Sequence, residues 1–246
     1  MISKLNKIVF FILILCFPWS MLFAQDGGTS NIFSKGVGAR QMGLSGAVVA
    51  YATDPTTIFW NPAGMEYLPQ KSFSLFYASM LEGTSYNFIG YVHPTLNLGT
   101  FGLGVSRIAT GDIVERPVDS YIDLNKFNYD QSEFFLSYAK IIKQLVSVGM
   151  NIKFERFSMF DLTDIGFGLD LSFMYLPEYD HFLLRNLRLG LTITNAYAPR
   201  LNPGDETDFL PHRFLFGLAK PIQLSESQMP LIWLFSVEKE IGRAHV

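Results

Sequence analysis

Beyond residue 70, apolar and polar residues alternate along most of the chain. In residues 145–157 every second side chain is apolar, and small, polar or charged side chains lie between them. Alternation with a period of two places successive side chains on opposite faces of a β-strand. The pattern predicts nine strands, over residues 72–80, 86–93, 100–108, 132–140, 145–157, 165–175, 187–195, 213–220 and 230–238.

The two faces of these strands differ in chemistry. One face is rich in Phe, Leu and Ile, and the other carries glycine and charge. The longer strands reach the roughly 9–11 residues of a tilted transmembrane strand, whereas strands in soluble sandwiches usually have about five or six. The pattern therefore predicts an all-β, antiparallel transmembrane β-barrel, and the alternative is a soluble β-sandwich. The side chains expected to face the lumen are Lys153, Glu155, Asp170 and Arg188.

Connection lengths also favour an outer-membrane barrel. The connections 94–99 and 141–144 are short, and 109–131 and 198–212 are long, which fits short periplasmic turns and longer external loops. Nine strands is an odd number, whereas bacterial barrels have an even number. The ending 240–246 resembles a translated sequencing adapter, so we expect a partial barrel over residues 71–239 followed by a non-native tail.

Residues 1–24 have the order of a secretory signal peptide. Two lysines precede the apolar run 8–17, and Ala24 stands before the expected cleavage point. An uncleaved anchor is the alternative, but the run is shorter than the ~18 residues of a spanning helix. Cys16 is the only cysteine, so the mature chain is expected to have no disulfide and no thiol metal site. These features predict export to the bacterial outer membrane.

Residues 25–70 do not alternate and are rich in glycine. The pairs Asp54–Pro55 and Asn61–Pro62 each join a capping side chain to a proline at the first helical position. They predict two short helical turns around Trp60. A compact segment of this kind in front of a barrel is expected to plug the lumen. The glycines expected to pack closely in it are Gly36, Gly38, Gly43 and Gly46.

The stretch GARQMGLSGAVVAYATDPTTIFWNPAGM, residues 38–65, resembles the N-terminal signature of the FadL/PorV superfamily of outer-membrane β-barrels. Asn61, Pro62, Ala63 and Gly64 match its Asn-Pro-Ala-Gly element, which in FadL-type proteins lies in a plug or hatch. The strand segments that follow resemble the PorV/PorQ branch most closely. The resemblance covers residues 30–239 and implies about fourteen strands in the complete barrel, so about five are missing from this chain.

The resemblance implies alternative functions. A PorV/PorQ-like protein is a component associated with type IX protein secretion, and its partners are secretion-machinery proteins or secreted cargo. A FadL-like protein is a channel for long-chain fatty acids or other hydrophobic compounds, with a lateral opening in its wall. Gly102 and Gly104 mark such an opening, or instead leave room for the plug. A third alternative is a structural outer-membrane protein that binds a partner through loops 109–131 and 198–212.

The sequence has little that indicates an enzyme. It contains no HExxH motif and no zinc-ligand spacing, and the residues around Ser45 depart from GxSxG. A hydrolase that uses His93 or His212 near a strand end is the remaining enzymatic alternative. The acidic residues Asp205, Glu206 and Asp208 indicate either a solvated loop or a cation site. We expect a non-enzymatic protein without cofactor or metal, in contact with membrane lipid and not with nucleic acid.

Overall fold

The chain divides into two compact units, Met1–Ser30 and Asn31–Val246. A computed structural model describes residues 32–115, 126–143, 145–177, 185–201, 208–222 and 231–241, all of which belong to the second unit. The predicted signal peptide, residues 1–24, lies outside the described residues. The predicted tail 240–246 is described only as far as Ile241, where the last strand ends.

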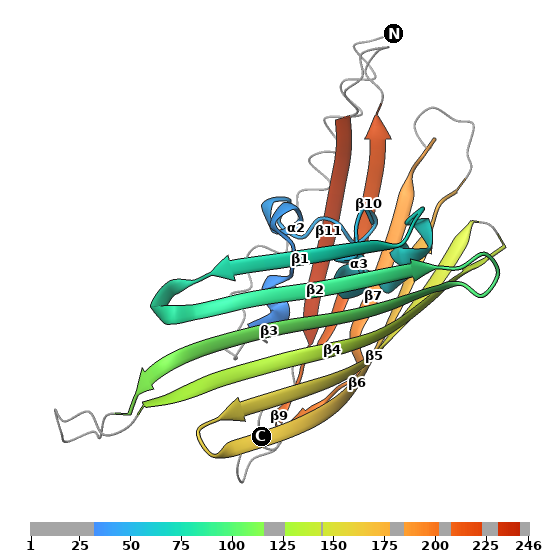
Figure 1. The fold of residues 1–246 in the computed structure, drawn as a ribbon. Coiled ribbons are helices and arrows are strands. Elements are labelled where there is room, and N and C mark those ends of the chain that lie inside the picture. Colours follow the sequence, from blue (N-terminus) through green and yellow to red (C-terminus); the bar gives the residue numbers. More distant parts are fainter. Residues whose placement is uncertain are drawn as a thin grey trace. The chain divides into compact units, whose positions relative to one another are not determined.

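Nine strands form a single antiparallel sheet, and the sheet order follows the chain order (Figure 1). The strands are β1 (Ser72–Ser79), β2 (Thr84–Pro94), β3 (Thr100–Val114), β4 (Lys126–Ile142), β5 (Val146–Met159), β6 (Leu162–Tyr175), β7 (Arg188–Tyr197), β10 (His212–Ile222) and β11 (Leu231–Ile241). Each overlaps one of the nine predicted segments, so the prediction of an all-β protein with antiparallel strands is confirmed.

Strands β3 and β4 are longer than the sequence predicted. Their pairing continues past a register shift between Thr110 and Ile113 and ends where Val114 faces Lys126. The irregularity interrupts the alternation in the sequence, and the predicted loop 109–131 was therefore too long. Residues 115–125 separate the two strands, and of these 116–125 lie outside the described residues.

Part of the predicted external loop 198–212 folds back onto the sheet. The two-residue strands β8 (Arg200–Leu201) and β9 (Asp208–Phe209) pair with each other. Leu201 is buried, and a Cβ added to Gly168 in β6 would come within 2.7 Å of Pro199. Gly168 in β6 thus leaves room for this segment of the chain. The alternation in the sequence did not predict β8 and β9, because strands of two residues are too short to show a pattern.

Four short helices lie in the described chain before β1. They are η2 (Ile32–Lys35), α2 (Ala39–Gly43), α3 (Thr57–Trp60) and η3 (Pro62–Tyr67), and η4 (Leu81–Gly83) joins β1 to β2. Within residues 38–50 the helix is limited to α2. Within the described ranges, no helix has the length and hydropathy needed to cross a membrane.

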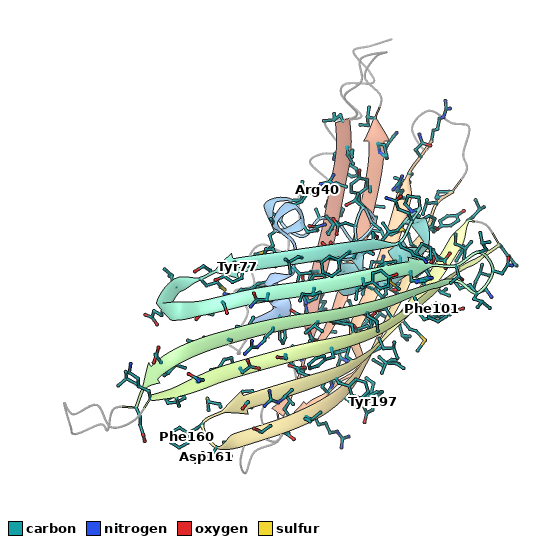
Figure 2. The ribbon with its side chains drawn as sticks, in the orientation of Figure 1. Arg40, Tyr77, Phe101, Phe160, Asp161 and Tyr197 are labelled. Carbon is teal, nitrogen blue, oxygen red and sulfur yellow. The ribbon has the colours of Figure 1, made fainter. Side chains whose placement is uncertain are left out.

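The sheet exposes its apolar face and buries its charged face. Leu103 is 57 % exposed and Phe154 is 48 % exposed, whereas Lys153, which directly precedes Phe154 in β5, is 1 % exposed. Tyr77, Phe101 and Tyr197, labelled in Figure 2, are among the exposed aromatic residues. We call residues 32–70 the N-terminal segment. The face of the sheet that this segment covers is the inner face, and the exposed face is the outer face. The predicted separation of the two faces is confirmed.

The hydrophobic core lies between the N-terminal segment and the inner face. From the segment it takes Phe33, Val37, Ile58 and Met65, and from the sheet it takes Tyr86, Phe88, Phe135 and Leu215. Every second residue of a strand faces inward, so bulky residues at a few inner positions suffice to seat the segment. Other inner positions are small or polar, and they form the site described next.

Candidate functional site

The Asn-Pro-Ala-Gly element joins the N-terminal segment to the sheet. Asn61 caps η3 as the sequence predicted: its Oδ1 accepts a hydrogen bond from the Ala63 amide at 3.1 Å, and Pro62 takes the first helical position. The Asn61 Nδ2 donates to the carbonyl of Val49 at 2.6 Å and to that of Phe173 in β6 at 3.3 Å. One side chain therefore fixes the helix start, the segment and the wall together.

The backbone of η3 lies directly against strands β5 and β6. The Ala63 amide also donates to Ser172 Oγ at 2.8 Å, and Ser147 Oγ donates to the Ala63 carbonyl at 2.8 Å. A Cβ on Gly149 would lie 2.3 Å from the Ala63 nitrogen, so this position of β5 accepts no larger residue without displacing the helix. A Cβ on Gly64 would meet side chains of the segment itself at 2.6 Å. The element is thus an interface motif built on small residues.

Asp54 organises the turn before α3. Its Oδ1 accepts hydrogen bonds from the Thr56 amide at 2.8 Å and from Thr56 Oγ1 at 2.6 Å. Its Oδ2 accepts one from Gln41 Nε2 at 2.7 Å, which joins the turn to α2. The predicted helix start at Pro55 comes two residues too early, because α3 begins at Thr57 with Thr56 at its N-cap. The carboxylate therefore satisfies turn amides and fixes α2 against α3.

Trp60 packs inside the N-terminal segment. Its Nε1 donates to the Val37 carbonyl at 2.9 Å, and Cβ atoms on Gly36 and Gly46 would come within 2.2 and 2.9 Å of the indole ring. Both glycines have positive φ, 78° and 72°, which side chains rarely tolerate. The neighbouring Phe59 reaches the wall instead. These contacts make the indole the centre of the segment.

The other two predicted glycines behave differently from each other. Gly38 has a φ of 91°, and a Cβ there would meet Gln41 Oε1 at 2.2 Å. Gly43 is exposed, and a Cβ there would have no atom within 4 Å. The structure therefore packs three of the four glycines closely and leaves Gly43 at the surface.

On the inner face, next to the N-terminal segment, charged and polar side chains from five successive strands of the sheet are buried together. Their centre is Lys153, whose Nζ lies 3.0 Å from Asp170 Oδ1, 3.3 Å from Glu133 Oε1 and 2.5 Å from Asn195 Oδ1. We call this group the polar belt. Its members are Gln131, Glu133, Lys153, Glu155, Asp170, Asn195 and Arg213.

Further hydrogen bonds and an ion pair connect the belt residues with one another, with α3 and with β11. Asp170 also accepts hydrogen bonds from the Asn195 amide at 2.7 Å and from Asn151 Nδ2 at 3.1 Å. Asn151 donates in addition to the Ile58 carbonyl at 2.9 Å, which ties the belt to α3. Arg213 Nη2 lies 2.6 Å from the carboxylate of Glu238 in β11. The buried charges of Glu133, Lys153, Asp170 and Arg213 are tolerated because each lies in an ion pair.

A small cavity separates the belt from the N-terminal segment. Its volume is about 10 Å³, and it is lined by belt residues and by aromatic side chains of the segment, Phe33, Phe59 and Trp60. This is about the room that one water molecule needs. A second cavity of about 150 Å³ lies near the ends of β7 and β10 and includes Arg200 and His212. The belt is therefore closely covered by the segment.

Arg188 is separate from the other three predicted lumen-facing residues. Lys153, Glu155 and Asp170 belong to the belt, whereas Arg188 begins β7 and stands over the ring of Tyr51 at 5.6 Å. Arg40, labelled in Figure 2, stands over the same ring at 5.5 Å. Arg188 thus contacts the N-terminal segment at the short-turn end of the sheet, through a cation–π interaction.

Gly102 and Gly104 leave room for the N-terminal segment. A Cβ on Gly102 would lie 2.6 Å from Met65 Sδ, and one on Gly104 would lie 3.1 Å from Ile58 Cγ2. At both positions β3 is paired with β2 on one side and β4 on the other. The observed contacts correspond to the alternative in which these glycines accommodate the plug, and the wall is continuous at this point.

Four belt members were missed by sequence reasoning: Gln131, Glu133, Asn195 and Arg213. Glu133 and Arg213 lie within predicted strands, at positions whose parity already assigned them to the polar face. Asn195 is harder to assign, because the pairing of β6 with β7 shifts register between Leu169 and Leu171. A charged residue within a strand that otherwise alternates was therefore the usable signal.

Two groups of η3 have shifted pKa values. Burial raises the pKa of the Glu66 carboxyl, against hydrogen bonds from Thr100 that lower it. Burial also raises the pKa of the Tyr67 hydroxyl to about 12, and the charge of Glu66 adds to that effect. Both groups lie where the N-terminal segment meets the sheet.

The residues considered for chemistry are dispersed. His93 lies in β2 beside Tyr91, with 3.1 Å between its Nδ1 and the tyrosine hydroxyl, whereas His212 begins β10 and contacts the Asn195 carbonyl. Asp205 and Glu206 lie outside the described residues. Among the side chains that are described, no group of His, Cys, Asp and Glu is arranged to hold a metal ion.

Comparison of the chain with protein-family models, with curated proteins and with solved structures gives no match. The assignment of a function therefore rests on the residues and their geometry. Two features matter most, the exposed apolar outer face and the inner face occupied by the N-terminal segment.

Proposed function

We propose that this chain forms part of the wall and the plug of a non-enzymatic β-barrel in a bacterial outer membrane. The observation that carries the proposal is the inverted burial of the sheet, with apolar side chains exposed and Lys153, Glu155 and Asp170 buried. In water this arrangement exposes a large apolar surface, which promotes aggregation. In a bilayer the same surface meets acyl chains, and the charges face the interior of a barrel.

The boundaries of the apolar face support this placement. Arg107, Ser132 and Arg156 lie directly opposite one another across β3, β4 and β5, and both arginines bind Asp130. We call the three residues that lie opposite one another, Arg107, Ser132 and Arg156, the charged row. Lys140 follows Asp130 by ten residues in β4, about 34 Å along a strand. At a typical tilt of about 40° this corresponds to an apolar band roughly 25 Å tall, as in outer-membrane barrels.

Within this class, we propose a PorV/PorQ-like role as a component associated with type IX secretion, with secretion-machinery proteins or secreted cargo as partners. The resemblance of residues 38–65 to the superfamily signature supports the class. The close covering of the belt supports a partner-binding role rather than passage of hydrophobic compounds, because a cavity of about 10 Å³ does not hold an acyl chain.

Membrane placement is tested by charge substitution on the outer face. Leu103→Lys is expected to block insertion into membranes, since lysine near the bilayer midplane costs about 2–4 kcal/mol in such barrels. The matched control is Leu96→Lys in the short turn between β2 and β3, where Leu96 is fully exposed. Membrane fractionation with urea washing measures both variants. Unchanged insertion of Leu103→Lys, or recovery of the unaltered protein as a soluble species, would contradict the placement.

The role in secretion is tested by deleting the gene in its host. We expect secreted cargo to accumulate in the periplasm and to reach the surface again after complementation. Unaltered cargo secretion together with lost uptake of radiolabelled fatty acid would favour the channel alternative instead.

A further inference from the structure

The hairpins β3–β4 and β5–β6 continue beyond the level of the charged row. There the inner face, which is polar at the belt, carries apolar side chains, and the Tyr129 hydroxyl still donates to Gln131 of the belt. Directly opposite residues of neighbouring strands share a face of the sheet, and so do residues two apart in one strand. Ile113 pairs with Phe127, Tyr129 pairs with Met159, and Met159 pairs with Leu162. With the turn residue Phe160, these side chains form the hairpin-tip patch. Its members are Ile113, Phe127, Tyr129, Met159, Phe160 and Leu162.

The patch is ordered by its own contacts and is partly open to solvent. The rings of Phe127 and Phe160 lie 5.6 Å apart at an angle of 69°, which joins the two hairpins. Phe160 is 52 % exposed and Leu162 is 41 % exposed. Figure 2 shows Phe160 at the end of the β5–β6 hairpin, next to Asp161. An apolar group with this much exposure is typical of an interaction surface.

Acidic groups surround the patch. Within the described part of these tips, the carboxylates are Asp112, Glu115, Asp161 and Asp164. The described lysine of these tips is Lys126, whose Nζ lies 3.3 Å from Asp112 Oδ1 in an exposed ion pair. The surface therefore joins apolar side chains to an excess of negative charge. A complementary surface is apolar and basic.

Lipid and small hydrophobic ligands fit this surface poorly. The patch lies beyond the charged row, outside the band that meets acyl chains, and its carboxylates repel anionic headgroups and fatty acids. Small apolar ligands also need a concave pocket that buries most of their surface. The cavities found in the described residues lie elsewhere, at the belt and beside Arg200. A polypeptide, which binds across a larger and flatter area, fits better.

We propose that the hairpin-tip patch docks a polypeptide segment of a partner protein, one that presents aliphatic or aromatic side chains beside Lys or Arg. The inference rests on the proposed membrane placement, which puts the tips in water. Phe160 and Leu162 are the apolar anchors, and Asp161 and Asp164 select basic partners. Anchors of this type carry most of the binding energy of an interface, whereas peripheral charges govern specificity and salt dependence.

The test uses the full chain in nanodiscs of zwitterionic lipid and two fluorescent peptides, one of alternating Leu and Lys and one of alternating Leu and Glu. Fluorescence anisotropy, corrected with empty nanodiscs, is expected to show saturable binding of the Leu/Lys peptide only. The variant Phe160→Ser/Leu162→Ser should weaken it by roughly tenfold or more. Leu96→Ser, at a fully exposed apolar position at the opposite end of the sheet, should leave it unchanged.

A second variant tests charge selection independently of the anchors. Asp161→Lys/Asp164→Lys is expected to reverse the preference towards the Leu/Glu peptide. Inserted protein that binds neither peptide, or binds both regardless of these substitutions, would overturn the inference. Binding only after removal of residues 116–125 would overturn it too, because the chain's own segment would then be the occupant. Failure of the protein to enter nanodiscs would instead contradict the membrane placement.

Discussion

Lys153 in β5 and Asp170 in β6 form an ion pair of 3.0 Å between two side chains that are almost entirely buried. Two neighbouring strands thus place opposite charges on the face that a water-soluble sheet would fill with apolar residues. Glu133 completes the group from the other side of β5. The pair shows how the inner face satisfies charge in the absence of bulk water.

Removing the cation at the centre of the polar belt is expected to be costly. Lys153→Met leaves Glu133 and Asp170 buried without a counter-charge, which costs about 3–5 kcal/mol in comparable cases. Urea unfolding of the protein in vesicles measures the change. Lys140→Met, an exposed lysine in β4, is the control and should alter stability little. The double variant Lys153→Met/Asp170→Asn should lose less than the sum of its two single variants. Strict additivity would argue against the direct pairing.

Enlarging Gly149 should displace η3 from the sheet. The new Cβ of Gly149→Ala would lie 2.3 Å from the Ala63 nitrogen, and overpacking of this kind costs about 1–3 kcal/mol. We expect faster proteolysis within the N-terminal segment while the strands stay protected. Gly43→Ala adds the same atom where no neighbour lies within 4 Å, and its proteolysis should match that of the unaltered protein. Equal protection in both variants would contradict the close approach.

Asn61 should be more important than an ordinary helix cap. Asn61→Ala removes a cap worth about 0.5–2 kcal/mol and also two hydrogen bonds to the carbonyls of Val49 and Phe173. Denaturant unfolding is expected to show a larger loss than Asp54→Ala, whose contacts stay within the segment. A loss confined to the cap's ordinary range would mean that the contact with β6 contributes little.

Glu66 gives the docked segment a pH dependence. Because burial raises its pKa in the folded state, its contribution to stability is present at low pH and lost as the pH rises through the raised value. Stability of the segment should therefore decline from acidic to neutral pH. Glu66→Gln should flatten this profile, as measured by protease protection across the range. An unchanged slope in Glu66→Gln would assign the dependence to another group.

The strands and the capped turns were predictable because they depend on local patterns. Strict alternation revealed β5 and β6, and Asn61–Pro62 has the sequence of a helix start. The assembly of the belt was not predictable, because parity assigns a side chain to a face but does not fix the register between strands. Lys153 and Asp170 lie in contact because of that register. Arg188 is on the same face of the sheet, but it lies at the end of its strand and away from them. The return of Pro199 onto Gly168 likewise depends on tertiary packing alone.

The central claim is that the outer face meets lipid, and spin labels on β4 test it most directly. The only cysteine, Cys16, lies in the predicted signal peptide, so single labels at Leu136→Cys and Lys126→Cys need no background removal. In liposomes we predict that the label at residue 136 relaxes with oxygen dissolved in the bilayer. The label at 126, beyond the charged row, should relax with a water-soluble nickel complex. Equal access of the nickel complex to both labels would contradict the account.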